Sequence, residues 1–241
     1  MSDQKIKMKK WFLQSAAGEW LMGKLSQGDI ERFCKANKTG PNEKVLIVHS
    51  DDMAYEYYFP NREKANVRNG EDIDIKSDKE YQNIQSPDNV YDVVVCTGLL
   101  EHVPDPTATL KELKRVLKSG GKLLVSASAS FSTHSAPDNY FHATLFGMKK
   151  WLDDASFDIK SINPSSRPFR TIGILLQRIC YQTDMSMFFK FFIFLCAKIV
   201  PFFDMFIKKD YGNIQKSYEI QSSLYSNVQV VAVKPEQVST S

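Results

Sequence analysis

Two histidines, an aspartate and a tyrosine stand within nine residues, from His134 to His142, which is dense for a plain loop. An imidazole with an ordinary pKa near 6.5 can take up a proton at neutral pH, which is the chemistry of a general base. Carboxylate and phenol groups hold hydroxyls by hydrogen bonds. The segment could therefore bind and deprotonate a ligand, or it could cap and pack the helix that we expect from Leu145.

A further histidine, His102, follows Glu101 and stands two residues before Pro104. It could remove a proton in the same way. It could also be a structural residue that orients the loop ahead of Pro104. Both interpretations stay open at the level of sequence.

Buried strands must position these side chains. Val45–Val48 is wholly apolar and Tyr91–Thr97 is rich in β-branched residues, as expected of parallel strands covered on both faces. Pro106 can take the first position of a helix, Ser119-Gly120-Gly121 can end that helix, and Lys122–Ser128 follows as the next strand. A strand, a helix and a strand with short joints form a right-handed βαβ unit, which predicts a parallel sheet.

The remaining segments extend this alternation into a doubly wound α/β fold. We expect one or two helices in residues 11–38, broken near Gly28, and two short strands in residues 64–69 and 72–76. The order is completed by a helix over Leu145–Phe157, a strand over residues 158–163 and a last strand over Val228–Lys234.

Bulk properties favour one intracellular domain. The 241 residues, 43% of them hydrophobic, predict a helical extension at 1–43, a core at 44–165, a helical insertion or lid at 166–222, and a last strand and tail at 223–241. A net charge of +3, from 31 basic and 28 acidic residues spread evenly, gives no indication of a nucleic-acid partner. The four cysteines form no CxxC or His/Cys group and the N-terminus has no apolar run of signal length, so we expect a reduced, cytoplasmic protein.

The stretch YDVVVCTGLLEHVPDPTATLKELKRVLKSGGKLLVS, residues 91–126, resembles the second half of a class I S-adenosylmethionine (SAM)-dependent methyltransferase. The resemblance is to the small-molecule group that includes ubiquinone-pathway O-methyltransferases and many surface-polysaccharide enzymes. A weaker similarity covers residues 44–157 and returns at 228–235. It implies a Rossmann-like sheet of seven strands, mostly parallel with an antiparallel last strand. SAM and substrate would bind at the carboxyl ends of the central strands.

The first strand departs from this family. A glycine-rich turn usually follows it, because bare backbone lets the cofactor approach closely, whereas this chain has His49, Ser50, Asp51 and Asp52. Glycine-type dihedrals would cost each of these residues on the order of 1 kcal/mol or more. Asp51 could still accept a hydrogen bond from the ammonium group of SAM. Two hypotheses follow: a methyltransferase that retains SAM, or a non-catalytic scaffold that has lost it.

The resemblance assigns the other cofactor contacts position by position. Asn69 or Glu71 would bind the ribose hydroxyls and Asp78 the adenine amino group, although each could instead be a solvated loop residue. Thr97, Gly98 and Leu99 would lie beneath the methionine arm, where Gly98 permits close approach.

Acceptor residues follow from a second resemblance, to the H-x-x-P-x-D-x-Y-x-x-(Y/H) stretch of polysaccharide-associated methyltransferases. It implies His134 as the acceptor-site base, Asp138 or Tyr140 as ligands of substrate hydroxyls, and His142 as the last member of the motif. The ubiquinone branch binds a divalent metal with a glutamate three residues before Glu101. Gly98 stands there in this chain, so we expect no metal.

Residues 187–206 hold eight of the sixteen phenylalanines. Lys190, Lys198, Pro201 and Asp204 interrupt the run, so it does not resemble a membrane span. It could form a lid or dimer helix over the active site, or an interfacial helix with phenylalanines in the acyl boundary. An interfacial helix would suit a lipid-linked glycan acceptor.

Overall fold

The computed structural model describes residues 20–21, 23–48, 55–66, 74–208, 210 and 222–236. The chain divides into two compact units. The helical unit comprises Met1–Gly28 and Ser166–Leu224, and the sheet unit comprises Asp29–Ser165 and Tyr225–Ser241. The four-part division of one domain that the sequence suggested stays a prediction.

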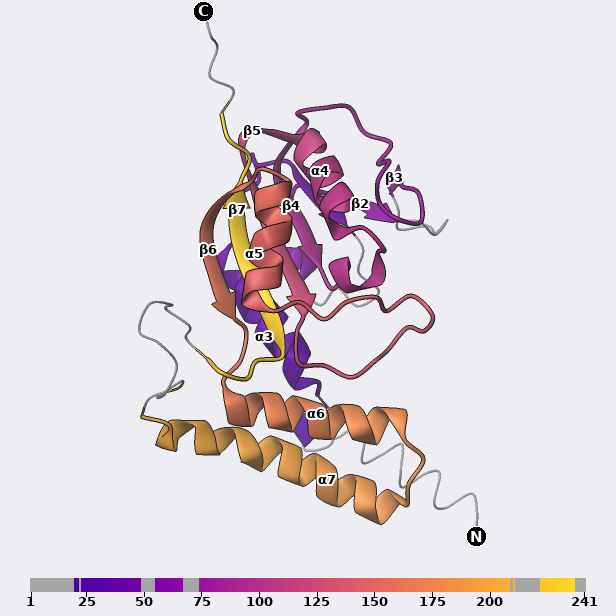
Figure 1. Ribbon diagram of the computed structural model, residues 1–241, viewed down its shortest axis with the longest axis vertical. Coiled ribbons are helices and arrows are strands. Elements are labelled where there is room, and N and C mark those ends of the chain that lie inside the picture. The colour runs from indigo at the N-terminus through magenta and orange to yellow at the C-terminus, as the bar shows by residue number, and fades with distance from the viewer. Residues whose placement is uncertain are drawn as a thin grey trace, which may run out of the picture. The chain divides into compact units, whose positions relative to one another are not determined.

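A seven-stranded sheet forms the centre of the sheet unit (Figure 1). Its order is β3-β2-β1-β4-β5-β7-β6. Neighbours from β3 to β5 are parallel, whereas β7 runs antiparallel to both β5 and β6, which confirms the predicted topology. The strands are β1 (Val45–Val48), β2 (Arg62–Asn66), β3 (Ile75–Lys76), β4 (Tyr91–Thr97), β5 (Leu117–Ser128), β6 (Asp158–Pro164) and β7 (Asn227–Val233).

The two strands predicted as buried lie at the middle of this sheet. Every residue of β1 is buried, as are residues 93–97 of β4, because helices and loops cover both faces. The helix α4 (Pro106–Val116) begins at the predicted proline, and the Asp105 side chain caps it by accepting a hydrogen bond from Ala108 N at 3.0 Å. Its apolar stripe, Leu110, Leu113 and Val116, is fully buried.

The end of α4 differs from the prediction. The helix stops at Val116, and Leu117 already pairs with Tyr91 as the first residue of β5. The register then shifts, so that Val93 pairs with Lys122. Gly120, at φ +73°, therefore shapes an irregularity inside the strand and does not cap the helix.

Two further helix boundaries differ from those expected. The helix α3 (Leu25–Ala36) continues through Gly28, so the predicted break there is wrong; one glycine costs a helix only about 1 kcal/mol. The helix α5 (Leu145–Asp154) ends three residues before Phe157, and Ser156 follows in the left-handed region at φ +59°.

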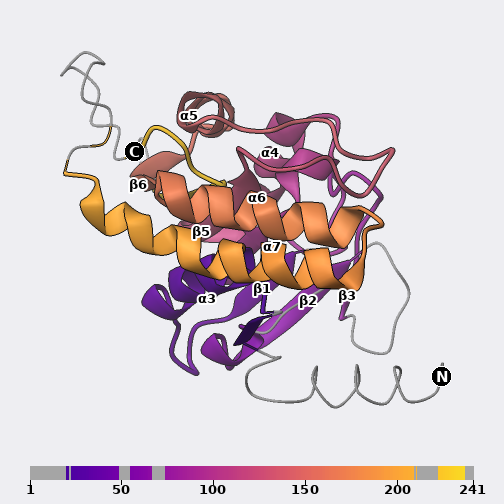
Figure 2. The same cartoon turned by 90° about the horizontal axis from the view of Figure 1, so that it is seen from below.

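The helical unit contains a hairpin of α6 (Pro168–Gln182) and α7 (Met187–Ile199), which lie side by side (Figures 1 and 2), followed by the 3₁₀ helix η3 (Val200–Phe206). Gly173 permits their close approach, because an added Cβ would stand 2.6 Å from the Ala197 carbonyl oxygen and 3.0 Å from Pro201 Cγ. Asp204 caps α6 by accepting hydrogen bonds from Phe169 N and Arg170 N, each at 2.9 Å. Among the described residues no helix is long and apolar enough to cross a membrane.

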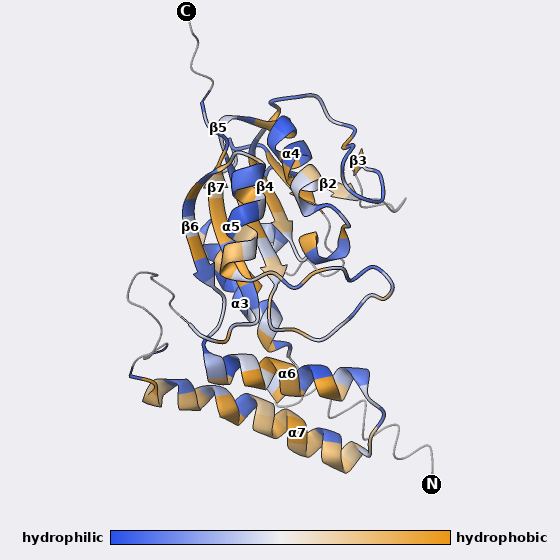
Figure 3. Cartoon of the chain, viewed as in Figure 1, coloured by the Kyte–Doolittle hydropathy of each residue, from blue (hydrophilic) through white to orange (hydrophobic). Residues whose placement is uncertain are grey.

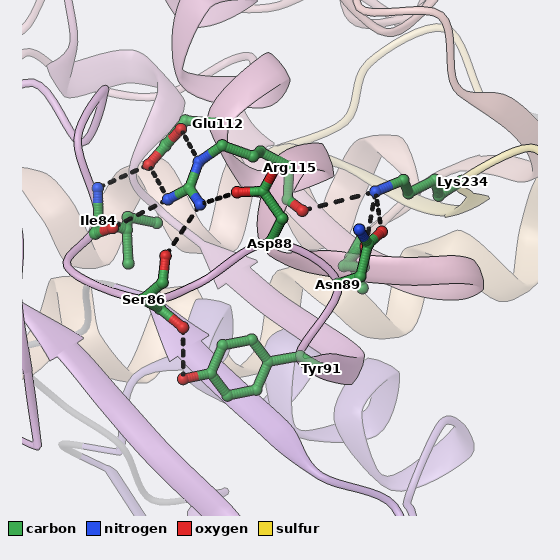
Figure 4. Close-up of polar contacts among 9 residues, drawn as sticks. Ile84, Ser86, Asp88, Asn89, Tyr91, Glu112, Arg115 and Lys234 are labelled. Atoms are coloured by element: carbon green, nitrogen blue, oxygen red, sulfur yellow. Dashed lines mark hydrogen bonds and ion pairs between the residues drawn. The ribbon is translucent and has the colours of Figure 1, made fainter.

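Arg115, near the end of α4, holds the loop before β4 (Figure 4). Its guanidinium donates to Glu112 at 2.7 and 2.8 Å, to Asp88 at 2.5 Å, and to the carbonyl oxygens of Ser86 and Ile84 at 2.8 and 2.9 Å. These bonds raise the pKa of Arg115 further above its usual range, despite the opposing effect of desolvation. The planar fork of arginine makes all of these bonds at once, which a lysine could not do.

Replacing Arg115 with alanine is expected to lower the free energy of unfolding by about 1–3 kcal/mol, because two carbonyl groups and Glu112 lose their donors. Urea denaturation measures the change. Lys150→Ala is the matched control, since the Lys150–Asp154 pair on α5 is an exposed i,i+4 contact worth at most about 0.5 kcal/mol. Equal losses in the two variants would contradict the structural role of the Arg115 bonds.

Candidate active site

The candidate site begins where β4 and β5 end side by side. Gly98, just after β4, has φ +67° and donates from its N–H to the Ser126 carbonyl oxygen at 3.1 Å. An added Cβ at Gly98 would meet no atom of the described residues within 4 Å. The turn therefore combines a glycine-type backbone with open space beside it, as close approach of a ligand requires.

The neighbours of Gly98 face inward. Thr97 is buried, and its hydroxyl is hydrogen-bonded to the Tyr55 hydroxyl. Leu99 is buried in the main hydrophobic core. Of the three residues predicted beneath the methionine arm, only Gly98 thus borders open space.

A buried carboxylate lies one turn further on. Glu101, in the 3₁₀ helix η2 (Leu100–His102), is 2% exposed. Its Oε1 accepts hydrogen bonds from Ser128 Oγ at 2.6 Å and Ser128 N at 3.2 Å, whereas its Oε2 is buried and has no hydrogen-bond partner among the described residues. A buried carboxylate oxygen without a partner is costly, so its retention points to a functional role.

Two histidines lie beside this carboxylate. The rings of His102 and His134 are in edge contact, with centroids 4.7 Å apart. His134 Nδ1 lies 3.0 Å from the Ser132 carbonyl oxygen, and His102 Nδ1 is hydrogen-bonded to the Asp138 carbonyl oxygen. A carbonyl oxygen only accepts, so in the neutral rings the proton sits on Nδ1 and Nε2 carries the lone pair.

Glu101, His102 and His134 therefore form one group, here called the Glu–His–His cluster, whose ligand atoms lie within 4.8 Å of one another. The sequence predicted the two histidines as separate candidates, and the structure brings them together. It did not assign Glu101, although its place next to His102 in the same turn was a signal.

The Glu–His–His cluster suits proton transfer, because the negative carboxylate stabilises the imidazolium that forms when a histidine takes up a proton. The same residue types also bind divalent cations, and metal-bound histidines commonly donate Nδ1–H to a carbonyl, as these do. The sequence predicted no metal here because Gly98 replaces the glutamate of the ubiquinone branch. That prediction remains open to experiment.

The predicted acceptor residues lie at the surface of the same loop. The Asp138 carboxylate lies 3.4 Å from Lys79 Nζ and accepts from the Tyr140 hydroxyl at 3.2 Å. Tyr140 and His142 are exposed. The alternative that the segment 131–144 caps the following helix holds for its last residue, because Thr144 caps α5 by accepting from Gly147 N at 3.0 Å.

For the other predicted cofactor residues, the described part of the chain shows no contact with this site. Asp78 is exposed and closes a turn by accepting a hydrogen bond from Gln82 N at 2.7 Å. The remaining predicted residues, His49, Ser50, Asp51, Asn69 and Glu71, lie outside the described residues.

Known proteins are similar to the part of the chain that carries most of this site. A family model described as a methyltransferase domain matches residues 48–125, from the end of β1 into β5. The match covers about a third of the chain and shows that residues 48–125 are similar to this methyltransferase-domain family. The domain thus includes Gly98, Glu101 and His102, whereas His134 lies just beyond its end.

Curated relatives of the methyltransferase domain cover it only in part. The chain is 34% identical over 104 residues to a tRNA U34 carboxymethyltransferase from Nautilia profundicola, covering 36% of this chain and 35% of that protein. It is 32% identical over 123 residues to a ubiquinone biosynthesis O-methyltransferase from Saccharophagus degradans, covering 48% and 50%. The matches thus span a third to a half of these relatives.

Solved structures show that the chain has the class I methyltransferase fold. A geranyl diphosphate C-methyltransferase from Streptomyces coelicolor, in complex with Mg²⁺, geranyl diphosphate and S-adenosylhomocysteine (SAH), matches with a TM-score of 0.55 at 10% identity. The match covers 92% of this chain and 85% of that one.

Proposed function

We propose that this protein is a SAM-dependent methyltransferase that methylates a hydroxyl of a small-molecule or glycan acceptor. The observation that carries the proposal is the pairing of Gly98 with the Glu–His–His cluster at the ends of β4 and β5. The first offers open space at bare backbone and the second offers a base. Methyl transfer to a hydroxyl needs both, because the donor must come close and a proton must leave.

The residues present fit SAM at Gly98, where a Cβ would project into the open space. SAM supplies an electrophilic methyl group on a sulfonium centre. Gly98 would admit the donor, and His134 Nε2 would take the proton of the acceptor hydroxyl as the oxygen–carbon bond forms, the methyl–sulfur bond breaks and SAH leaves. Glu101 stabilises the resulting imidazolium, and His102 packs against the His134 ring and fixes its orientation. Holding donor and acceptor in line supplies much of the rate.

The net charge of the chain bears on the class of acceptor. Relatives of the methyltransferase domain are named for tRNA and for ubiquinone biosynthesis. The small net charge of the whole chain, +3 from 31 basic and 28 acidic residues, favours a small or glycan acceptor over tRNA. Tyr140 and Asp138, joined by a hydrogen bond at the loop surface, are suited to bind acceptor hydroxyls. The cytoplasmic location and a homodimer stay predictions.

Thermal melts test whether the cofactor binds. At a hundredfold excess over Kd, SAM or SAH should stabilise the fold by roughly 2.7 kcal/mol, which raises Tm by about 5–10 °C in a chain of this size. ATP is the control, because it shares the adenosine but lacks the methionine arm. No shift with SAM or SAH at millimolar concentration would favour the non-catalytic scaffold.

The acceptor is found with radiolabelled SAM and a panel of phenols, sugar nucleotides, lipid-linked glycans and tRNA. Label transfer to a phenol or glycan hydroxyl supports the proposal. Label transfer to tRNA alone would contradict the proposed acceptor class but would still support methyl transfer.

A further inference from the structure

An exposed apolar stripe runs along α7 and η3 in the helical unit. Figure 3 shows α7 as one of the most hydrophobic helices of the chain. The side chains of the stripe are 37–83% exposed and recur every three or four residues, so they lie on one helical face. The stripe consists of Phe188, Phe191, Phe192, Leu195, Ile199, Phe202, Phe203 and Phe206.

The opposite face of α7 supplies the packing of the hairpin. Phe194 and Ala197 are buried, and Phe194 contacts Tyr181 of α6 with ring centroids 5.3 Å apart. Gly173 of α6 fits directly against the Ala197 carbonyl. Phe203 of the stripe also contacts the Phe169 ring of α6, with centroids 5.7 Å apart. The buried side chains of the hairpin nevertheless lie on the opposite face, and a run of exposed phenylalanines this long indicates an interaction surface.

The segment that carries the stripe has a net positive charge. Residues 166–208 contain six arginines and lysines but only two aspartates. One of these, Asp204, is engaged at the start of α6. Lys198 lies over the Trp20 ring, 5.5 Å from its centroid, and donates to the Gly23 carbonyl oxygen at 2.7 Å. Desolvation and, to a smaller extent, the charge of Arg170 lower the pKa of Lys198.

This charge selects among the possible partners of the stripe. A second copy would bring two positive helical units together, which disfavours self-association. An anionic lipid surface suits both features of this unit. Its acyl boundary can bury the phenylalanines, and its phosphates attract the lysines and arginines. We propose that α7 and η3 dock this chain on an anionic membrane surface without crossing it. The proposal is independent of methyl transfer.

Vesicle co-sedimentation of the full chain, without SAM, tests the proposal. The vesicles are phosphatidylcholine alone or phosphatidylcholine with about one third phosphatidylglycerol. We expect at least about tenfold tighter binding to the anionic vesicles, weakened by raised salt. The double variant Phe188→Asp/Phe202→Asp, at positions 83% and 68% exposed, should lower binding by about tenfold or more.

The matched control is Phe146→Asp, which places the same change at an exposed phenylalanine of α5, in the sheet unit. Its vesicle binding should equal that of the wild type, and circular dichroism should show all variants folded. Wild-type protein that stays in the supernatant with anionic vesicles overturns the proposal, as does undiminished binding of the double variant. A dimer that dissociates on the double substitution, without vesicle binding, would assign the stripe to a second copy. Because the assay contains no SAM, failed cofactor binding and failed docking are separate results.

Discussion

Replacing His134 with alanine is expected to lower kcat by about 10²–10⁴-fold while leaving the SAM-induced rise in Tm unchanged. The reason is that His134 is proposed to take the acceptor proton, whereas the donor is proposed to lie at Gly98, which follows β4 and donates to the Ser126 carbonyl oxygen. Release of SAH with an acceptor identified in the panel measures kcat, and melts measure cofactor binding. Added imidazole should restore part of the lost activity, since it can enter the space left by the ring.

The same assay separates a base from a metal ligand. With His134 as base, wild-type activity should persist in EDTA, and His134→Ala should respond to imidazole but not to metals. Activity that is lost in EDTA and returns with a divalent cation would reassign the Glu–His–His cluster as a metal site. A His134→Ala variant with wild-type turnover would exclude both roles.

Replacing Gly98 with alanine is expected to weaken SAM binding by about tenfold or more, which corresponds to about 1.4 kcal/mol. The left-handed backbone at φ +67° resists a side chain, and the added methyl group would enter the open space proposed for the donor. Isothermal titration measures the affinity for SAM, and urea denaturation measures the accompanying loss of stability, of order 1 kcal/mol.

Gly120→Ala is the matched control. Gly120 has φ +73°, and its added Cβ would meet only Glu236 Oε1, at 3.8 Å. It stands within β5, away from the carboxyl end of that strand. Both variants should lose similar stability from backbone strain, but only Gly98→Ala should lose SAM affinity. If Gly98→Ala and Gly120→Ala bound SAM with equal affinity, the proposed position of the cofactor at Gly98 would be wrong.

The sequence predicted those parts of the fold that local patterns determine. Pro106 and the spacing of Leu110 and Leu113 identify α4, and the β-branched run of β4 identifies a buried strand. The start of β5 was missed because the pairing of Leu117 with Tyr91 is a contact between segments far apart in the chain. A local glycine pattern is equally consistent with a helix cap and with an irregular strand.

The sequence predicted the two histidines of the candidate site, but it did not predict how they come together with Glu101. His102 and His134 follow adjacent parallel strands, so their common edge could be anticipated. The role of Glu101 could not, because its hydrogen bonds to Ser128 depend on how η2 packs against β5. The backbone around His49 to Asp51 lies outside the described residues, so the effect of the missing glycines is left to the cofactor melts.

The loop that carries His134 is tied to the sheet unit at several points. Ala143 N donates to the Ser128 carbonyl oxygen at 2.7 Å, and Tyr140 N donates to the Glu101 carbonyl oxygen at 2.8 Å. The loop between these contacts is thus held at both of its ends by backbone hydrogen bonds. Substitutions at residues 135–137 are expected to change which acceptors the proposed site binds while the strands stay in register. Directed evolution of acceptor choice would best begin there.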